Sequence, residues 1–496
     1  MMKFIQSRFD LFNLIIFGVF ATLIIRYQIQ LLTYLEWGDE TANIVTSKLI
    51  YAGKTLFSQI HELHGPLSYL PGLIVEQFGD FGVRGHRIPI AILQWLALIS
   101  LYFSPLLKRQ NFYLKLSYCV AAATVMVIYF ADLFGSTYLF QVMAGLFFVI
   151  ILAQYTLPAI ADPLSLNKFQ VFIGNVLILS LPFLAITYIP ISIALFIASW
   201  RKQFKQLILV SALFGLVGNL LFLTLIASIP GYFAMHFWIN AFISRKYVEG
   251  VDLGLRYLLS SSLSSITSDL ARFSIFLLLT SGLATLAHRE KNIPWRSFVL
   301  GLGIASLLIR SMGFQGLPLL YLFLSIPLVF FHALPKLNRS SSLFLSPILI
   351  VCFIKLALLN PANISDRQIA TESEFSKLVK LVTNKNDRII AWPFENREYI
   401  LADRLPASGN FFYLPWQRDY YANPKFGINI DSCEEFKTTS PKIMLINPYP
   451  FGGVDWQDYI PACVLELIKT NYTQIPNTAY YLRKDIYQSY KPLINQ

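Results

Sequence analysis

The amino-acid sequence predicts an α-helical polytopic membrane protein followed by a small α/β domain. Hydrophobic residues make up 55% of the 496 residues and charged residues only 14%, a composition typical of membrane proteins. Apolar runs of about 20 residues recur along residues 1–360, and each is long enough to cross the hydrocarbon core of a bilayer. Residues 361–496 instead alternate short apolar and polar pieces between proline and glycine turns, which predicts a mixed α/β domain.

The membrane part is predicted to contain eleven spans. Lys3 and Arg8 precede the first apolar run and no small-residue cleavage site follows it, so we expect an uncleaved span with a cytoplasmic amino end. The connection at 185–190 is short, so two of the spans could also form one long broken helix. The predicted spans lie at about 11–35, 86–107, 116–134, 138–157, 171–184, 186–200, 207–229, 270–287, 298–309, 317–331 and 343–359.

Residues 66–81 are apolar but short for a crossing, and Pro71 and Gly72 interrupt them. We therefore expect a juxtamembrane or re-entrant helix there. With that segment left out of the count, the later basic loops, such as 108–115 and 201–205, all face the cytoplasm. The first loop, residues 36–85, and the C-terminal domain, residues 361–496, then lie on the outer side.

The net charge of +12 is confined to the membrane part, because residues 361–496 hold 15 acidic and 15 basic side chains. A basic surplus beside membrane spans indicates topology and contact with anionic membrane lipid. No array of basic and aromatic residues suggests a strand-binding groove, so nucleic acid is not expected as a partner.

The four cysteines fall into two pairs of different character. Cys119 and Cys352 lie in apolar runs, where packing is the simplest interpretation. Cys433 and Cys463 lie in the polar C-terminal domain, where an outer location would permit a disulfide and an inner one would not. The spacings typical of structural zinc sites are missing from the sequence.

The first loop concentrates the polar chemistry of the membrane part. Six acidic residues fall in the interval from Glu36 to Asp80. Three of the six histidines of the chain, His61, His64 and His86, lie in or just after this interval. Such groups are costly beside a bilayer unless they have partners or a function. We therefore predict that this loop is the functional centre.

The helical spacing of apolar residues at 40–51 predicts an amphipathic helix lying at the membrane interface and ending near Gly53. Asp39 and Glu40 open this helix, where they could cap it. They could instead accept a proton from an attacking hydroxyl or hold a divalent cation. The sequence leaves these roles open, and both can hold at once.

Several further polar residues have both a structural and a functional interpretation. His61, Glu62 and His64 form either an exposed polar loop or a contact with phosphate or sugar. Arg84, His86 and Arg87 either snorkel at the membrane surface or bind a lipid phosphate. Asp132 is either a loop acid or a second acid of the site. Arg310 either snorkels at the membrane surface or binds a phosphate. A long outer loop is expected at 231–269, and it carries His236, Asn240, Arg245 and Tyr247.

The order of these pieces resembles the polytopic type C (GT-C) glycosyltransferases, which include protein O-mannosyltransferases and bacterial lipid A aminoarabinose transferases. The resemblance covers about the first 330 residues. Many relatives have Lys-Pro-Pro where this chain has His64–Gly65–Pro66, so a lysine contact to the donor phosphate is not carried over. The matching pieces are Asp39–Glu40, Gly53, Gly65–Pro66–Leu67 and Arg87–Ile88–Pro89.

The resemblance implies an inverting sugar transfer from a polyprenyl-phosphate donor to a lipid, glycan or protein acceptor on the outer face of a bacterial inner membrane. Asp39 falls at the position of the family's catalytic acid, and Glu40 adjoins it. No cofactor is implied, and a divalent metal stays open. The predicted donor-phosphate ligands are His64, Arg84, Arg87, Arg245 and Arg310. The predicted substrate contacts are His61, Glu62, Asp132, His236, Asn240 and Tyr247.

A transporter or flippase of lipid-linked sugars is the alternative class, and a polymerase or ligase of surface glycans is another. Transporters typically show inverted repeats and charges near the middle of the membrane. In this sequence no internal repeat is evident, and the charges lie at the outer boundary of the spans. This pattern favours a transferase.

Overall fold

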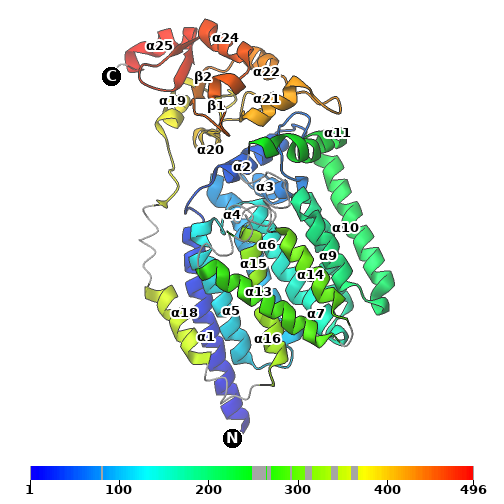
Figure 1. The fold of residues 1–496 in the computed structure, drawn as a ribbon. Helices are drawn as coiled ribbons and strands as arrows, with labels where there is room; N and C mark the ends of the chain where they lie inside the picture. The colour runs from blue at the N-terminus through cyan, green and yellow to red at the C-terminus, as the bar shows by residue number, and fades with distance from the viewer. Residues whose placement is uncertain are drawn as a thin grey trace.

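The computed structural model of the chain describes residues 2–79, 82–247, 264, 270–290, 293–307, 316–336, 345–358 and 367–494. Helices form an upright bundle, and an α/β unit lies across one end of it (Figure 1). The amino terminus lies at the other end of the bundle.

Helices of the bundle overlap the positions of the predicted spans. Three stretches of the described residues, 112–129, 140–161 and 202–226, are long and apolar enough to cross a membrane, and shorter apolar helices coincide with other predicted spans. The number of crossings, eleven, stays a prediction. The helices are α1 (Met2–Leu31), α4 (Gly82–Tyr102), α5 (Phe112–Thr124), η3 (Val125–Tyr129), α6 (Phe140–Ile151), η5 (Leu152–Thr156), α7 (Leu157–Ala161), α8 (Lys168–Ser180), α9 (Ile189–Ser199), α10 (Lys205–Ile226), α13 (Leu270–Arg289), α14 (Trp295–Ser306), α15 (Gly316–Phe323), α16 (Pro327–Ala333) and α18 (Ser346–Leu358).

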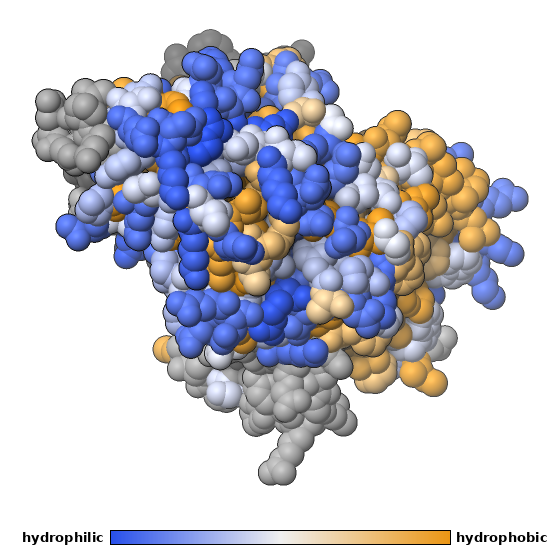
Figure 2. Space-filling model, turned by 90° about the horizontal axis from the view of Figure 1, so that it is seen from above, coloured by the Kyte–Doolittle hydropathy of each residue, from blue (hydrophilic) through white to orange (hydrophobic). Residues whose placement is uncertain are grey.

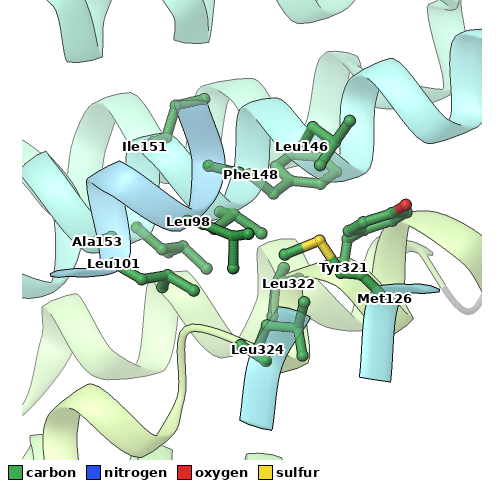
Figure 3. Close-up of a cluster of buried hydrophobic side chains, with 14 of the residues drawn as sticks. Leu98, Leu101, Met126, Leu146, Phe148, Ile151, Ala153, Tyr321, Leu322 and Leu324 are labelled. Carbon is green, nitrogen blue, oxygen red and sulfur yellow. The ribbon is translucent and has the colours of Figure 1, made fainter. Parts of the chain in front are cut away.

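The centre of the bundle is an apolar core around α6. Phe148 of α6 is fully buried, and the close-up shows it together with Leu98 of α4 and Leu322 of α15 (Figure 3). Lipid tails are as apolar as these side chains, so tight packing rather than escape from water holds such helices together.

The first loop folds as the sequence predicts in its main elements. The amphipathic segment forms α2 (Gly38–Tyr51), which is followed by Gly53 in a left-handed conformation with φ of 89°. The apolar segment after it forms η1 (Pro66–Tyr69) and α3 (Leu70–Glu76). With 7 residues, α3 is too short to cross a bilayer.

Two expectations for the outer side need correction. The predicted surface position of α2 is wrong, because most of its residues, Glu40 to Ser47 and Leu49, are buried. The helix lies between the bundle and the α/β unit, which covers the face that we expected to meet lipid (Figure 1). The predicted long loop begins with helix instead, in α11 (Ile229–Gly231) and η10 (Tyr232–Ile243). Its aromatic residues pack as a helical face that the loop prediction overlooked.

The C-terminal unit is built on a four-stranded sheet of order β1-β2-β4-β3. β1 (Ile390–Trp392) and β2 (Ile443–Ile446) pair in parallel, with Ala391 opposite Leu445. β4 (Tyr480–Arg483) is antiparallel to both β2 and β3 (Tyr472–Gln474). The helices of the unit are α19 (Glu374–Val382), α20 (Arg397–Ala402), α21 (Pro415–Ala422), α22 (Ser432–Thr439), α23 (Trp456–Tyr459), α24 (Ala462–Asn471) and α25 (Lys484–Ile494).

The two cysteines of this unit, Cys433 and Cys463, form a disulfide, which the sequence had left open. All residues of β1 and β2 are buried, so these two strands lack the exposed face that alternation would give.

The C-terminal unit packs closely on the first loop. One hydrophobic cluster joins Val45 and Phe57 of the loop to Phe375 and Phe411 of the unit. At Gly409, a Cβ atom would fall 1.8 Å from the backbone oxygen of Gln59, so only glycine allows the two backbones to approach this closely.

Candidate functional site

The first turn of α2 carries the two predicted catalytic acids, where a negative charge suits the positive end of the helix dipole. Trp37 occupies the N-cap position and makes no side-chain capping hydrogen bond. Asp39 and Glu40 therefore lie inside the helix and neither is its N-cap residue. Asp39 is partly exposed, whereas Glu40 is fully buried.

Glu40 is paired with Arg87 of α4. Nε of Arg87 donates to Oε1 of Glu40 at 2.7 Å, and Nη2 donates to Oε2 at 2.5 Å. The backbone N–H of Tyr138 also donates to Oε1, at 2.7 Å. Both charged side chains have no exposed surface, so this is a desolvated and fully compensated ion pair.

The remaining donors of Arg87 are also used inside the protein. Its Nη1 donates to the carbonyls of Leu31 at 2.8 Å and Tyr34 at 2.5 Å, and its Nη2 donates to that of Leu35 at 2.6 Å. A guanidinium has five N–H groups, and the contacts to Glu40 and to these three carbonyls use all of them. Arg87 thus has no donor left for a phosphate.

Glu62 is the other buried carboxylate of the loop, at 2% exposure. Its Oε2 accepts from the backbone N–H of Leu63 at 2.7 Å, and Nδ1 of His64 lies 3.5 Å from the same oxygen. In the described part of the chain, no Lys or Arg pairs with it. Burial raises the pKa of Glu62 to about 7, and the nearby carboxylate of Asp39 adds to this effect, against the amide of Leu63. The charges of Asp39 and Glu62 thus interact, and we call the region around these two carboxylates the acidic site.

Tyr69 completes the acidic site and was not predicted from the sequence. It is fully buried, and burial, followed by the charge of Glu62 beside it, raises its pKa well above the usual range. Asp39 contributes in the same direction. Tyr69 thus stays a neutral hydroxyl next to two carboxylates. The segment Gly65–Pro66 that turns the chain before it was the only sequence signal near this residue.

Two of the predicted substrate contacts, His236 and Asn240 of η10, lie against the same loop. Nδ1 of His236 is 2.8 Å from the carbonyl oxygen of Leu63, and Nδ2 of Asn240 donates to that oxygen at 2.9 Å. Burial lowers the pKa of His236 to about 4, so the ring is neutral at pH 7 and its Nδ1–H is the donor. These contacts fix the backbone that carries Glu62 and His64.

Gly65 holds the loop from its other side. Its N–H donates to the carbonyl of Leu184 at 2.9 Å. A Cβ atom at this position would fall 2.1 Å from the carbonyl oxygen of Phe183. The glycine that the sequence analysis matched to a family motif is thus required by close packing against the bundle.

His61 and Tyr247 face the C-terminal unit rather than the acidic site. Nδ1 of His61 is 2.9 Å from the hydroxyl of Tyr421, and burial lowers the pKa of His61 to about 3. The hydroxyl of Tyr247 donates to Oδ2 of Asp419 at 2.5 Å. Both residues join the bundle side of the molecule to the α/β unit.

Asp132 and Arg84 lie at exposed positions. The Asp132 side chain is 61% exposed, accepts from the hydroxyl of Tyr34 at 2.5 Å and pairs with Arg367 at 3.4 Å. Arg84 is exposed in the first turn of α4. The side chain of Arg245 and the whole of Arg310 lie outside the described residues.

A second charged cluster lies behind α2. Oε1 of Glu76 lies 3.3 Å from Nζ of Lys48 and 3.0 Å from Nε2 of His86, and Nδ1 of His86 is 2.7 Å from the carbonyl oxygen of Gly82. His86 and Arg87 are both buried, which excludes snorkelling for these two residues. Among the described residues, no group of three or more His, Cys, Asp and Glu side chains is placed to hold a metal ion.

Comparison with solved structures identifies the fold. The chain superposes on ArnT from Cupriavidus metallidurans in the apo state with a TM-score of 0.59 and 10% identity, over 94% of this chain and 96% of ArnT. The same ArnT bound to undecaprenyl phosphate gives a TM-score of 0.57 and 9% identity, over 95% and 97% of the two chains.

This chain has the fold of ArnT. The similarity extends through the C-terminal unit, since it covers nearly the whole of both chains, whereas the sequence resemblance was confined to the membrane part. The archaeal oligosaccharyltransferase AglB from Archaeoglobus fulgidus, in complex with an inhibitory peptide and a dolichol-phosphate, matches at a TM-score of 0.44 and 11% identity, over 86% of this chain and 69% of AglB. No family model and no curated protein sequence matches the chain.

Proposed function

We propose that this GT-C protein is a glycosyltransferase that moves a sugar from a polyprenyl-phosphate donor to a hydroxyl of a lipid, glycan or protein acceptor. The observation that carries the proposal is the full-length fold similarity to ArnT, which has been captured with undecaprenyl phosphate. A donor of this kind lies in the bilayer and carries its own leaving group. The protein then has to position a hydroxyl, accept its proton and stabilise phosphate charge.

Asp39 is the proposed general base. It lies at the family position of the catalytic acid, and it is the partly exposed member of the acidic site, whereas Glu62 is buried. In the proposed step, the acceptor hydroxyl attacks the anomeric carbon and gives its proton to the Asp39 carboxylate. The bond between that carbon and the phosphate oxygen breaks, and polyprenyl phosphate leaves with the electron pair. A single displacement of this kind inverts the anomeric carbon.

We propose that Glu62, with Tyr69 beside it, sets the net charge around Asp39. A pKa of about 7 leaves Glu62 largely protonated below neutral pH, so the site then carries one negative charge instead of two. Glu40, which we predicted as a catalytic partner, is given a structural role in this proposal because Arg87 neutralises it.

The donor phosphate needs cations other than Arg87. Of the predicted ligands, His64 lies at the acidic site, at 3.5 Å from Glu62. Arg84 is exposed in the first turn of α4. Arg245 and Arg310 remain predicted ligands from the sequence.

We further propose that the protein is a bacterial inner-membrane protein with its C-terminal unit on the outer side, which the disulfide Cys433–Cys463 supports because disulfides form in oxidising compartments. Cysteine labelling in intact cells tests this. A cysteine at Lys336 should be protected from an impermeant reagent, and one at Lys469 should react. Reaction of both or of neither would contradict the topology.

The function itself is tested with purified protein in lipid nanodiscs, a panel of polyprenyl-phosphate sugars and an extract of cell-envelope acceptors. Transfer predicts release of polyprenyl phosphate together with sugar on an acceptor, and the Asp39→Asn protein serves as the matched blank. The rival flippase predicts intact donor with no product. If no member of the panel is cleaved while donor crosses the bilayer of proteoliposomes, the transferase proposal is wrong.

A further inference from the structure

An exposed aromatic surface joins the outer end of the bundle to the C-terminal unit. Its members on η10 are Phe233 and Phe242, which are exposed, and Trp238, which is partly exposed, and its member on the C-terminal unit is the exposed Phe426. The ring of Trp238 lies 4.5 Å from that of Phe242 and 6.3 Å from that of Phe426, measured between centroids. We call these four residues the aromatic surface.

The aromatic surface continues the exposed face of α10. This helix is 25 residues long when its first turn at 202–204 is included, and only 22% of its most apolar stretch is buried. Leu221 and Leu225 are exposed at its outer end, and Ile229 is exposed immediately after it. Seen from the side of the C-terminal unit, an apolar band follows the right-hand edge of the molecule, where α10 lies (Figures 1 and 2).

The turn that carries Phe426 is unusual for a turn in water. Phe426 has a φ of 55° and is 54% exposed, and Gly427 follows with a φ of 70°. A bulky side chain in this left-handed region is a genuine outlier, and the surrounding structure has to hold it there. Asn or Gly would adopt this backbone conformation at a lower cost in an exposed turn. Exposure to water therefore does not explain why a phenylalanine occupies this position.

The neighbouring Lys425 gives the surface its charge. Its ammonium lies 5.9 Å from the centre of the Trp238 ring and 3.1 Å from Oδ1 of Asn423. Aromatic rings with a flanking cation are the residues that settle at the level of lipid headgroups, because the ring suits the acyl boundary and the ammonium suits the phosphate.

We propose that the turn 424–427 and the outward face of η10 insert into the leaflet on the side of the C-terminal unit, with Lys425 on an anionic lipid phosphate. The C-terminal unit would then be seated on the bilayer as well as on the first loop. This matters for the acidic site, because the inward face of η10 carries His236 and Asn240, which hold the backbone next to Glu62.

The test uses the full-length protein in nanodiscs that contain anionic phospholipid. Cysteine replaces Phe426 in a Cys119→Ala, Cys352→Ala background and carries an environment-sensitive fluorophore. Lys469→Cys is the matched control, since α24 lies at the far end of the C-terminal unit from the bundle (Figure 1). Lipids with a nitroxide below the headgroup should quench the label at 426 several-fold more than at 469, and iodide in solution should do the reverse.

The second measurement uses the intrinsic fluorescence of Trp238 in protein that keeps Phe426. The difference in fluorescence between the wild-type and Trp238→Phe proteins isolates Trp238, and brominated phospholipids should quench that difference. Lys425→Glu should reduce both signals in anionic nanodiscs and have a smaller effect in neutral ones. Equal iodide access at 426 and 469, together with no lipid quenching of Trp238, would overturn the proposal and leave the surface open to a soluble partner. The outcome does not depend on glycosyl transfer, so the two proposals can fail separately.

Discussion

Glu40 and Glu62 are both buried carboxylates of the first loop, and their surroundings differ completely. Glu40 meets a guanidinium whose five donors are all satisfied inside the protein. Glu62 meets a backbone amide, a histidine and the charge of Asp39, and its pKa rises to about 7. The fully paired Glu40 supports the fold, whereas Glu62, whose pKa lies near neutral pH, is the acid that we place in the proposed reaction site.

Removing the partner of Glu40 should have the largest effect on stability. Arg87→Ala leaves Glu40 buried and unpaired, together with the carbonyls of Leu31, Tyr34 and Leu35, so we expect a loss of about 3–5 kcal/mol and little folded protein. The double variant Glu40→Leu, Arg87→Met should recover much of the loss, because it removes both charges. Thermal unfolding in detergent measures both proteins. An Arg87→Ala protein as stable as the wild type would show that the pair does not hold α2 to α4.

Neutralising Glu62 should stabilise the protein at high pH, whereas removing the partner of Glu40 destabilises it. Its folded pKa of about 7 lies above the unfolded value, so the folded state binds more protons and stability falls as pH rises from about 4.5 to 7. Glu62→Gln abolishes this fall, and at pH 8 it should stabilise the protein by up to about 3 kcal/mol. Glu36 is also raised to about 7 by burial, so Glu36→Gln is the control that separates the two groups. Parallel pH curves for wild-type and Glu62→Gln proteins would contradict the role of Glu62.

The loop that carries Glu62 should be destabilised by an added methyl group at Gly65. Gly65→Ala places a methyl group against the carbonyl of Phe183, and overpacking of this kind costs typically about 1–3 kcal/mol. Gly218→Ala in α10, where nothing lies within 4 Å and the helical backbone accepts alanine, is the control for the glycine change itself. Equal stability of the two variants would mean that the loop yields at Gly65.

Breaking a partly exposed ion pair should have the smallest effect on stability. Lys54 and Glu435 meet at 3.1 Å across the boundary between the first loop and the C-terminal unit, with exposures of 21% and 27%. Because water screens this pair, Lys54→Ala should cost no more than about 1 kcal/mol. A loss near that of Arg87→Ala, measured in the same unfolding assay, would mean that burial does not decide the value of an ion pair in this loop.

The sequence predicts the elements of the first loop better than their contacts. Helical spacing located α2, and the interrupting Pro71 and Gly72 correctly limited the next segment to short helices. The spacing of apolar residues also made α2 look like a surface helix, because a face that packs on the C-terminal unit has the same pattern as one that meets lipid. The expected loop after α10 was misread for a related reason, since an aromatic-rich helix with His236 and Asn240 on one side lacks a clear period.

The functional residues show the same limit. Asp39 and Glu40 are adjacent and chemically alike, so the sequence assigns them the same roles. What separates them is Arg87, which is 47 residues away in the chain, and the amide of Tyr138, which is 98 away. Tyr69 was missed because a lone tyrosine in an apolar segment gives no signal until Glu62 is placed beside it.

The division between Asp39 and Glu40 is tested most directly by the rate of sugar transfer per folded molecule in the Asp39→Asn and Glu40→Gln proteins. Unfolding and gel filtration set the folded fraction of each. Asp39→Asn should keep wild-type stability and lose about 10²–10⁴-fold in turnover, as expected for a lost general base. Glu40→Gln should lose stability, while the folded fraction keeps a turnover near that of the wild type. Near-normal transfer by Asp39→Asn, or a loss of turnover confined to folded Glu40→Gln, would contradict the account.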